Sequence, residues 1–480
     1  MKIAFTTLGC KLNYAETSTY ARGFKAAGWE VVPWTSVADV YLVNTCAVTE
    51  TAEKKSRNLI RRAHKTAPEA RIVVTGCYAQ LRREELLAIP GVWKVFGADE
   101  KAQVVPIVAE GTGSEIVSAS LQPLPSASPT GPSLLRGRGW PRISEPVPSS
   151  TMFPAYSAPF HGASRRPAVP GILPPGKIVE GEKAAGDSRG QSPLQPKERT
   201  RSFLKVQDGC DNFCAYCTVP YARGRSRSIP VCEAVRQAKE IAEEGIREIV
   251  LTGVNTGDFG RTTGESFLDL LKALNEVEGI DRYRISSIEP NLITPEIVDW
   301  IASGTKFQPH FHIPLQSGSD TLLRKVGRRY DTALFASRID YIRSAMEQPD
   351  EPLVFFGIDV IVGLPGETEE LFQETLDFLK NRIRPAFIHV FPYSKRPGTR
   401  AAEMHGQVQD SVKTERVARL EALCEELHQA FLEANKGRKA QVLWESTRKD
   451  GKMGGYTGNY IRVERPYDPA RVNTLEEIVL

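Results

Sequence analysis

The sequence predicts an α/β protein with an open parallel sheet, an incomplete TIM-like barrel of six β/α units and a small C-terminal β-barrel. Apolar, β-branched runs alternate with amphipathic helical stretches in residues 1–112 and again in residues 198–436. A Pro/Ser/Gly-rich stretch separates these two regions, and closely spaced short strands follow the second one. A chain of 480 residues is long enough for several such domains.

The first region, residues 1–112, is predicted to form the open sheet. Its buried strands are KIAFTTLG, DVYLVNT and RIVVTG, and helical stretches such as AEKKSRNLIRRAHK separate them. One cysteine follows each strand: Cys10, Cys46 and Cys77. Because the carboxyl ends of parallel strands share one rim, we expect these three cysteines to lie together at a ligand site. The alternative is three small, separately packed core residues.

Residues 118–197 are predicted to be a disordered insert. The segment is crowded with Pro, Ser and Gly and lacks hydrophobic periodicity, so it cannot bury enough apolar surface to offset its ordering entropy. A plain solvated linker is the preferred interpretation. RNA binding through its arginines is the alternative.

The second region, residues 198–436, alternates six candidate strands with helices, as an incomplete parallel barrel requires. The strands are SFLKVQDG, EIVLTG, RYRISSIE, HFHIPL, VFFGIDVIVG and FIHVFPYS. The loop CDNFCAYC follows the first of them, on the face where barrels carry their chemistry. A long helix then leads into the tail, residues 437–480, which is predicted to be the small β-barrel.

The loop CDNFCAYC places Cys210, Cys214 and Cys217 together without a fourth ligand. A structural zinc site needs four ligands, and no histidine or further cysteine lies within twelve residues of the loop. Three thiolates can instead hold a [4Fe–4S] cluster with one open iron. The chain carries eight cysteines, no secretory signal and no apolar run long enough to span a membrane, so we expect a cytoplasmic protein with metal or redox chemistry.

These motifs resemble a known family. The C-x3-C-x2-C loop, with the aromatic Tyr216 before its last cysteine, resembles the radical S-adenosylmethionine (SAM) superfamily. LGCKLN, VNTCAVTETAEKKSRNLIRR and VTGCYAQ resemble the N-terminal domain of the methylthiotransferases, and HIPLQSGSD, GIDVIVGLPGETEE and HVFPYSKRPGTRAA resemble their radical SAM core. The tail, with GYTGNYIRV, resembles a TRAM domain, which is an RNA-binding β-barrel.

The resemblance implies two [4Fe–4S] clusters with SAM as cosubstrate. One cluster would be held by Cys210, Cys214 and Cys217 and would cleave SAM to a radical. The other, on Cys10, Cys46 and Cys77, would carry the sulfur to be inserted. Tyr216 is expected near the SAM adenine, and Gln316, Ser317, Gly363 and Gly366 are further candidate SAM contacts, for which a structural turn is the alternative. The implied partners are the anticodon loop of tRNA, a reductant such as a flavodoxin or ferredoxin, and a sulfur donor.

The stretch GCKLNYAETS around Cys10 resembles most the branch that adds a 2-methylthio group to threonylcarbamoyladenosine at position 37 of tRNA. Alternatives are the branches that act on isopentenyladenosine in tRNA or on an aspartate of a ribosomal protein. A non-catalytic iron–sulfur RNA-binding protein is an alternative of another class.

Two sets of basic residues are candidates for RNA binding. The barrel region carries clusters that include Arg223 and Arg328, which could together follow a phosphate backbone beside the site. In the tail we expect backbone contacts from Arg438, Lys439, Arg448, Lys449 and Lys452. Removal of residues 437–480 is therefore expected to impair tRNA modification and to spare SAM cleavage.

Overall fold

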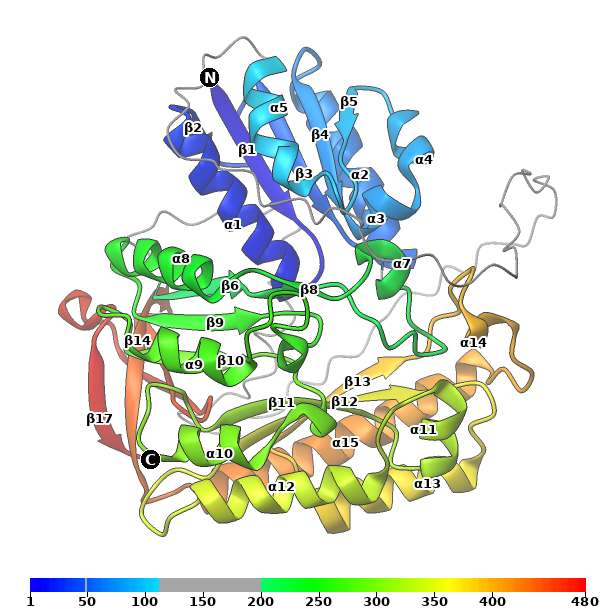
Figure 1. Ribbon diagram of the computed structural model, residues 1–480, viewed down its shortest axis with the longest axis vertical. Helices are drawn as coiled ribbons and strands as arrows, with labels where there is room; N and C mark the ends of the chain where they lie inside the picture. The colour runs from blue at the N-terminus through cyan, green and yellow to red at the C-terminus, as the bar shows by residue number, and fades with distance from the viewer. Residues whose placement is uncertain (48–49, 112–199) are drawn as a thin grey trace. The chain divides into compact units, whose positions relative to one another are not determined.

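The computed structural model describes residues 1–47, 50–111 and 200–480, and all of them belong to the same structural unit (Figure 1). The predicted insert at residues 118–197 lies outside the described residues. The α/β fold class predicted from the sequence is confirmed.

Residues 1–111 form a five-stranded parallel sheet in the order β2-β1-β3-β4-β5. Its strands are β1 (Lys2–Thr7), β2 (Glu30–Val32), β3 (Val40–Thr45), β4 (Arg71–Gly76) and β5 (Val92–Val95). The three strands predicted from apolar runs are β1, β3 and β4, which lie side by side in the centre of the sheet. Their carboxyl ends therefore meet at one rim, as predicted.

Helices cover both faces of this sheet. Successive residues of a strand point to opposite faces, and Ile3 and Phe5 pack in one apolar core while Ala4 packs in the other. Burial on both faces explains why these strands are continuously apolar rather than alternating. The helices are α1 (Lys11–Ala26), α2 (Glu50–Thr66), α3 (Cys77–Leu81), α4 (Arg83–Leu87), the 3₁₀ turn η1 (Lys101–Gln103) and α5 (Val104–Gly111).

The six predicted barrel strands are all present and form two three-stranded parallel sheets. They are β6 (Arg201–Lys205), β9 (Glu248–Thr252), β10 (Arg282–Ile285), β11 (His310–Gln316), β12 (Phe355–Val362) and β13 (Phe387–Pro392). A single bridge between Tyr283 and Phe307 links β10 to the segment that leads into β11. The terminal strands β6 and β13 do not pair with each other in the described ladders, so the barrel is incomplete, as predicted.

Helices pack on the outer side of these strands. The main helices are α8 (Val231–Glu243), α9 (Phe267–Asn275), α10 (Pro295–Ala302), α11 (Asp320–Val326), α12 (Thr332–Met346), α13 (Glu369–Asp377) and α15 (Asp410–Ala434). Shorter elements are β7 (Gln207–Asp208), α7 (Val219–Arg223), β8 (Arg227–Ser228), η3 (Thr256–Asp258), η4 (Pro290–Leu292), the π-helical turn η5 (Phe378–Ile383) and α14 (Arg400–Glu403).

The two faces of the barrel strands differ in chemistry. Residues such as Ile313 and Ile358 belong to the large apolar core formed with the helices. The residues that alternate with them, such as Arg284, His312 and Asp359, are polar and turn away from that core. A closed TIM barrel fills its interior with branched apolar side chains. The inner face here is instead suited to binding polar groups.

The tail forms a four-stranded antiparallel sheet in the order β16-β15-β14-β17. Its elements are β14 (Lys439–Lys449), β15 (Lys452–Thr457), β16 (Arg462–Pro466), η6 (Pro469–Arg471) and β17 (Leu475–Val479). Tyr456 and Tyr460 pack into an apolar cluster with Phe355, at the beginning of β12. The tail thus packs against the barrel, and its removal would expose part of this apolar cluster. That SAM cleavage survives removal of residues 437–480 stays a prediction.

A buried charge cluster strengthens this attachment. Glu248 lies 2.8 Å from Arg284 and 3.0 Å from Arg201, and Arg282 lies beside them. Arg284 also donates hydrogen bonds to the carbonyl oxygens of Thr457 and Gly458 in the tail. We call Arg201, Glu248, Arg282 and Arg284 the Glu248 network.

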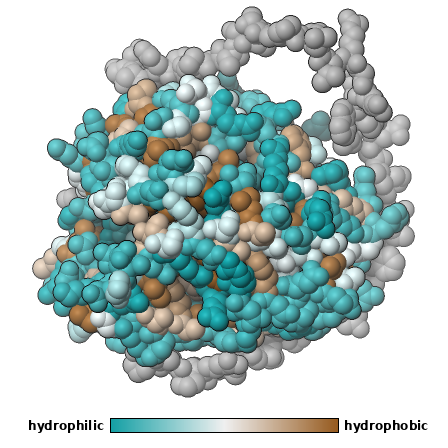
Figure 2. Space-filling view, turned by 60° about the horizontal axis from the view of Figure 1, so that its bottom comes forward, coloured by the Kyte–Doolittle hydropathy of each residue, from teal (hydrophilic) through white to brown (hydrophobic). Residues whose placement is uncertain are grey.

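On the face shown in Figure 2, hydrophobic residues occur in small groups among hydrophilic ones. Across the described residues, no helix combines the length and the apolar character needed to cross a bilayer.

Candidate functional site

The three N-terminal cysteines occupy the predicted rim. Cys10 precedes the first turn of α1, Cys46 follows β3, and Cys77 begins α3 directly after β4. A Cβ atom at Gly9 would lie 3.0 Å from the Cys46 sulfur, and Gly9 has φ +103°. Only glycine tolerates both this conformation and this close approach, so it brings the Cys10 turn against Cys46.

Asn13 ties these turns together, and sequence reasoning did not single it out. Its side-chain amide donates to the carbonyl oxygens of Leu8 (2.7 Å) and Thr45 (2.9 Å), which lie just before Cys10 and Cys46. Its Oδ1 accepts a hydrogen bond from Arg223 and lies 3.8 Å from the Cys10 sulfur. The asparagine of the GCKLN motif therefore orients two of the three cysteine turns.

Arg223 reaches this rim from α7, at the end of the cysteine loop of the barrel. Its guanidinium lies 3.0 Å from Glu16 and 2.9 Å from Asp208, and all three side chains are buried. Lys101 and Lys205 approach Glu16 at 2.7 and 3.1 Å. We call Glu16, Lys101, Lys205, Asp208 and Arg223 the Glu16 network.

The Glu16 network holds three cations against two carboxylates, and its positive excess lies beside the thiols. Burial raises the pKa of the Cys77 thiol, and Arg223 acts in the opposite direction. Burial would also raise the pKa of Glu16, but Lys205, Arg223 and Lys101 hold it well below its usual value. The carboxylates therefore stay ionised near pH 7, and Arg223 offsets part of the rise that burial causes in the pKa of the Cys77 thiol.

The second cysteine trio lies in the loop after β7. The backbone N–H groups of Asn212 and Val219 point at the sulfurs of Cys210 (3.5 Å) and Cys217 (3.4 Å). The Arg328 guanidinium donates to the Cys214 sulfur at 3.2 Å. Donors of this kind stabilise ligating thiolates and tune the metal that they bind.

Burial keeps two thiols of this loop neutral when no metal is bound. Burial raises the pKa of Cys210 to about 11 and that of Cys217 to about 12. Such thiols stay protonated near pH 7 unless a metal supplies positive charge, because metal ligands bind as thiolates. The residues present therefore fit an iron–sulfur cluster.

The sulfur spacing favours a cluster over one zinc ion. Among residues 1–47, 50–111 and 200–480, the ligand atoms that lie in threes within 4.8 Å of one another belong to His312, Asp359 and His389, and neither cysteine trio is so tight. Sulfurs about 2.3 Å from a tetrahedral zinc are about 3.8 Å apart. A cluster that offers each thiolate its own iron accepts a wider spacing.

Arg328 also organises the loop around Cys214. It lies 2.8 Å from Glu289, which accepts a hydrogen bond from Asn212, and it contacts the hydroxyl groups of Tyr330 and Tyr216. Its side chain is 5% exposed and that of Arg223 is 2% exposed. Both arginines were predicted to follow an RNA backbone, and this is wrong for both because buried acceptors hold them.

The candidate SAM contacts have mixed surroundings. Tyr216 packs against the apolar cluster that contains Leu364. Gln316 ends β11 with φ +71°, a rare conformation for a residue other than glycine and one that often marks a functional turn. The Ser317 hydroxyl lies 3.2 Å from that of Thr375 and accepts from the Ser319 N–H, so it already serves the turn.

Gly363 and Gly366 have positive φ and lie close to lysine side chains. A Cβ atom would lie 2.4 Å from the Lys413 side chain at Gly363 and 1.9 Å from the Lys325 amine at Gly366. Both glycines have positive φ. The backbone conformation therefore explains glycine at both positions, and their contact with SAM stays a prediction.

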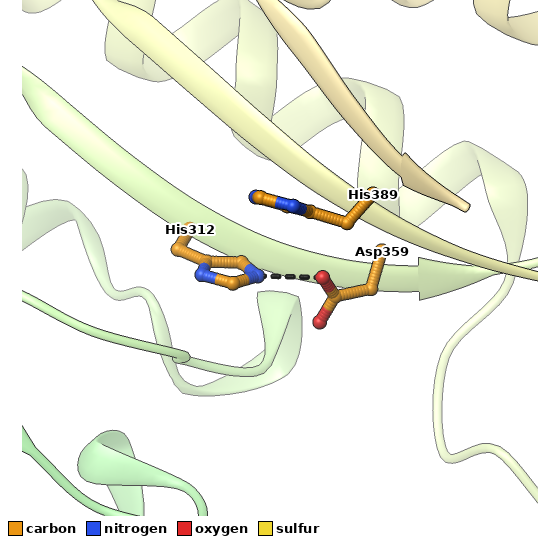
Figure 3. Close-up of side chains that lie close together, drawn as sticks. All are labelled: His312, Asp359 and His389. Atoms are coloured by element: carbon orange, nitrogen blue, oxygen red, sulfur yellow. Dashed lines mark hydrogen bonds and ion pairs between the residues drawn. The ribbon is translucent and has the colours of Figure 1, made fainter. Parts of the chain in front are cut away.

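Three further polar side chains lie together on the inner face of the barrel, and sequence reasoning missed them. His312, Asp359 and His389 come from the neighbouring strands β11, β12 and β13 (Figure 3). His312 Nε2 lies 2.7 Å from Asp359 Oδ1, and the two imidazole rings stack with their centroids 5.0 Å apart. A single polar residue within an apolar run, as in FHIPL and GIDVI, was the available signal.

Two family models match the chain. One is described as uncharacterized protein family UPF0004 and matches residues 2–97. The other is the radical SAM superfamily, which matches residues 204–379. The first contains Cys10, Cys46 and Cys77, and the second contains the loop from Cys210 to Cys217.

Several curated proteins are similar over nearly the whole chain. The threonylcarbamoyladenosine tRNA methylthiotransferase of Bacillus subtilis is 37% identical, covering 96% of this chain and 89% of its own. That of Aquifex aeolicus is 34% identical, covering 97% of both chains. The tRNA-2-methylthio-N(6)-dimethylallyladenosine synthase of Nitratidesulfovibrio vulgaris is 33% identical, covering 93% of this chain and 87% of its own.

A solved structure supports the fold. The radical S-adenosylmethionine methyltransferase TsrM of Kitasatospora setae superposes with a TM-score of 0.52 and 15% identity, over 83% of this chain and 73% of that one. At this identity the likeness concerns the arrangement of the elements alone.

Proposed function

Because this chain belongs to the radical SAM methylthiotransferase family, whose members use SAM and [4Fe–4S] clusters, we propose that it converts threonylcarbamoyladenosine at position 37 of tRNA to its 2-methylthio form. The observation that carries the substrate assignment is the similarity, over nearly the full length of both chains, to relatives named for this reaction.

The two cysteine trios are the proposed cluster ligands. Cys210, Cys214 and Cys217 would hold the cluster that binds SAM, and Cys10, Cys46 and Cys77 would hold the second. When bound, these groups supply a radical that breaks the C2–H bond of the base, and the sulfur and methyl group that replace the hydrogen. An aromatic C–H bond has no acidity usable near pH 7, so no side chain of the protein could open it as a general base.

The protein's own residues orient and charge this site. Arg328 and two backbone N–H groups stabilise the sulfurs of the barrel loop. Arg223 extends from the end of the same loop to the rim of the other trio, where it binds Asn13 and Glu16. A short, buried connection of this kind fixes the two trios relative to each other, as a reaction that uses both requires.

Exposed aromatic residues beside the barrel loop support an RNA substrate. Phe213 lies within the loop, Tyr221 follows it on α7, and their rings meet edge to face with centroids 6.0 Å apart. Both rings are exposed, and the Arg225 guanidinium lies over Phe213. Unpaired bases of an RNA loop stack on such aromatic and arginine surfaces.

Reconstitution tests the proposed reaction. Anaerobically reconstituted enzyme, supplied with SAM, a reductant and sulfide, should convert tRNA carrying threonylcarbamoyladenosine to the methylthio form, detected by nucleoside mass spectrometry. It should bind about eight irons, and a Cys210→Ala/Cys214→Ala/Cys217→Ala variant about four.

A Cys46→Ala variant is the matched control, because it should cleave SAM and yet insert no sulfur. The substrate assignment would be overturned if the enzyme modified isopentenyladenosine tRNA or a ribosomal protein and did not modify threonylcarbamoyladenosine tRNA. The radical mechanism would not be affected by that result. Loss of all iron in the triple variant would show that the N-terminal trio is not an independent site.

A further inference from the structure

His312, Asp359 and His389 form a polar group that the reaction described above does not use. Their nearest ligand atoms all lie within 4.8 Å of one another, and all three project from the same face of the sheet (Figure 3). Asp359 pairs with His389 in the register of β12 and β13, so the arrangement follows from the strand pairing and not from chance side-chain placement.

The hydrogen-bonding capacity of this group is only partly used. His312 and Asp359 bond to each other at 2.7 Å, and among the described residues no hydrogen bond reaches the His389 ring. Burial, and after it the neighbouring His312, lower the pKa of His389 to about 3, so its imidazole is neutral near pH 7 with one donor and one acceptor. His312, Asp359 and His389 are each partly exposed, so a polar ligand can reach them and add hydrogen bonds to the donor and acceptor of His389.

Residues next to each cysteine trio lie near this group. Lys11, which directly follows Cys10, is close enough for its charge to act on both Asp359 and His389. On the other side, the His312 carbonyl accepts from the Ile288 N–H, and the adjacent Glu289 bonds Asn212 of the barrel cysteine loop.

We propose that His312, Asp359 and His389, together with Lys11, bind the polar group on N6 of the target adenosine and thereby select threonylcarbamoyladenosine over isopentenyladenosine. This inference rests on the proposed function. A threonylcarbamoyl group carries a carboxylate, a hydroxyl and urea N–H and C=O groups. Lys11 suits the carboxylate, Asp359 accepts from a hydroxyl or N–H, and His389 offers both a donor and an acceptor.

An isopentenyl group can satisfy none of these partners. A site built to hydrogen-bond its substrate discriminates strongly against an analogue that lacks the polar atoms, because its own buried groups are then left unpaired. A purely apolar pocket would instead accept both side chains with a much smaller difference.

A metal ion is the competing occupant, since two histidines and one carboxylate are common ligands. Two observations argue against it. The 2.7 Å contact between His312 and Asp359 is the length of a charge-assisted hydrogen bond, with a proton between the two atoms. The Lys11 charge nearby opposes a divalent cation and favours an anionic group.

The test compares His389→Leu, which removes the donor and acceptor at similar size, with His389→Gln, which keeps both. Reconstituted full-length enzyme is assayed with tRNA that carries threonylcarbamoyladenosine, isopentenyladenosine or unmodified adenosine at position 37. Affinity without SAM and turnover with SAM are both measured. Each variant is normalised to its own iron content, and His405→Leu, at an exposed position outside the barrel strands, is the matched control.

We expect His389→Leu to reduce the preference for threonylcarbamoyl over unmodified tRNA about 10- to 100-fold, in affinity and in turnover. His389→Gln should keep most of the preference, and His405→Leu all of it. An unchanged preference in His389→Leu, or an equal loss on every tRNA, overturns the inference.

Metal analysis adds an independent outcome. Zinc or manganese bound beyond the irons, and lost in Asp359→Asn, would make the group a metal site and overturn the inference. The activity of the wild-type enzyme separates failure of the proposed substrate from failure of this inference. If it modifies only isopentenyladenosine tRNA, the proposed substrate is wrong and this inference falls with it, whereas an active wild type with an indifferent His389→Leu overturns this inference alone.

Discussion

The Glu16 and Glu248 networks both join the barrel to another part of the chain through buried charges. Each has more cations than carboxylates, and the groups that lie beside the additional cations differ. In the Glu248 network three arginines surround Glu248, and Arg201 also pairs with Glu445 of the tail at 2.9 Å. Backbone carbonyl oxygens of the tail accept from Arg282 and Arg284. In the Glu16 network two carboxylates balance most of the charge, and Arg223 remains beside the cysteine thiols.

The difference separates a structural role from a functional one. Neutral carbonyl oxygens do not titrate, so the Glu248 network fixes the tail to the barrel and does nothing else that its contacts indicate. Thiolates do bind metal, so the Glu16 network both joins two domains and sets the charge at a ligand rim. Substitutions in the two networks should therefore have different consequences.

The largest loss of stability is expected for Glu248→Gln. This change removes the carboxylate shared by three buried arginines, and breaking a buried ion pair from one side costs about 3–5 kcal/mol. Urea denaturation of the reconstituted protein should show it, with Glu84→Gln at an exposed position as the control. A loss under about 1 kcal/mol would mean that Glu445 and the carbonyl oxygens of the tail satisfy the arginines without Glu248.

The free energy of unfolding should depend on pH through the Glu248 carboxylate. Burial would raise the pKa of Glu248, but Arg284 and Arg201 lower it to about 2. A folded-state pKa below the unfolded value gives stability that is present above about pH 4.5 and is lost as the pH falls toward 2, on the order of 3 kcal/mol in total. The difference in stability between wild type and Glu248→Gln should shrink over this window, and a constant difference would contradict the assignment.

The Glu16 network should respond less in stability and more in chemistry. Glu16→Gln leaves Asp208 to pair with Arg223, so we expect a loss of about 1–3 kcal/mol. Removal of a negative charge near the N-terminal trio should raise the reduction potential of its cluster by tens of millivolts, measured by EPR-monitored titration. The barrel cluster should not change, and neither cluster should respond to Glu248→Gln.

The sequence was sufficient for the strands and for the grouping of the cysteines. The apolar run RIVVTG and the position of Cys77 directly after it are local features of the sequence. The cysteines are then grouped because the carboxyl ends of parallel strands share one rim. The six barrel strands were recognisable for the same reason. Local periodicity determines where an element lies, whatever surrounds it.

The buried networks could not be predicted because their members are far apart in the chain. Arg223 bonds Asn13 and Glu16, about two hundred residues away, and from the sequence it belongs to an ordinary basic cluster. Gly363 and Gly366 looked like places for a ligand, whereas Lys413 and Lys325 approach them. The inner-face histidines carried only a short alternation, which indicates a strand and not a site.

The smallest effect on stability should come from a third set of cations, which is exposed. Arg448 and Lys449 end β14 and Lys452 begins β15, and all three lie on the surface, unlike Arg438, which bonds the carbonyl oxygens of Gln348 and Glu351. Removal of the whole tail would take away the carbonyl oxygens that accept from Arg282 and Arg284. An Arg448→Ala/Lys449→Ala/Lys452→Ala variant keeps these bonds and therefore tests RNA binding by the tail alone. It should leave stability within about 0.5 kcal/mol of wild type.

Its tRNA affinity should fall about equally for modified and unmodified tRNA, and the slope of log affinity against log salt should decrease by about 2–3, because up to three phosphate contacts are lost. A variant with Lys239, Lys272 and Lys380 changed to Ala removes the same charge from the outer helices and should keep the wild-type slope. Equal slopes for the two variants would show that Arg448, Lys449 and Lys452 do not contact the phosphate backbone of tRNA. The tail would then serve the barrel through the Glu248 network alone.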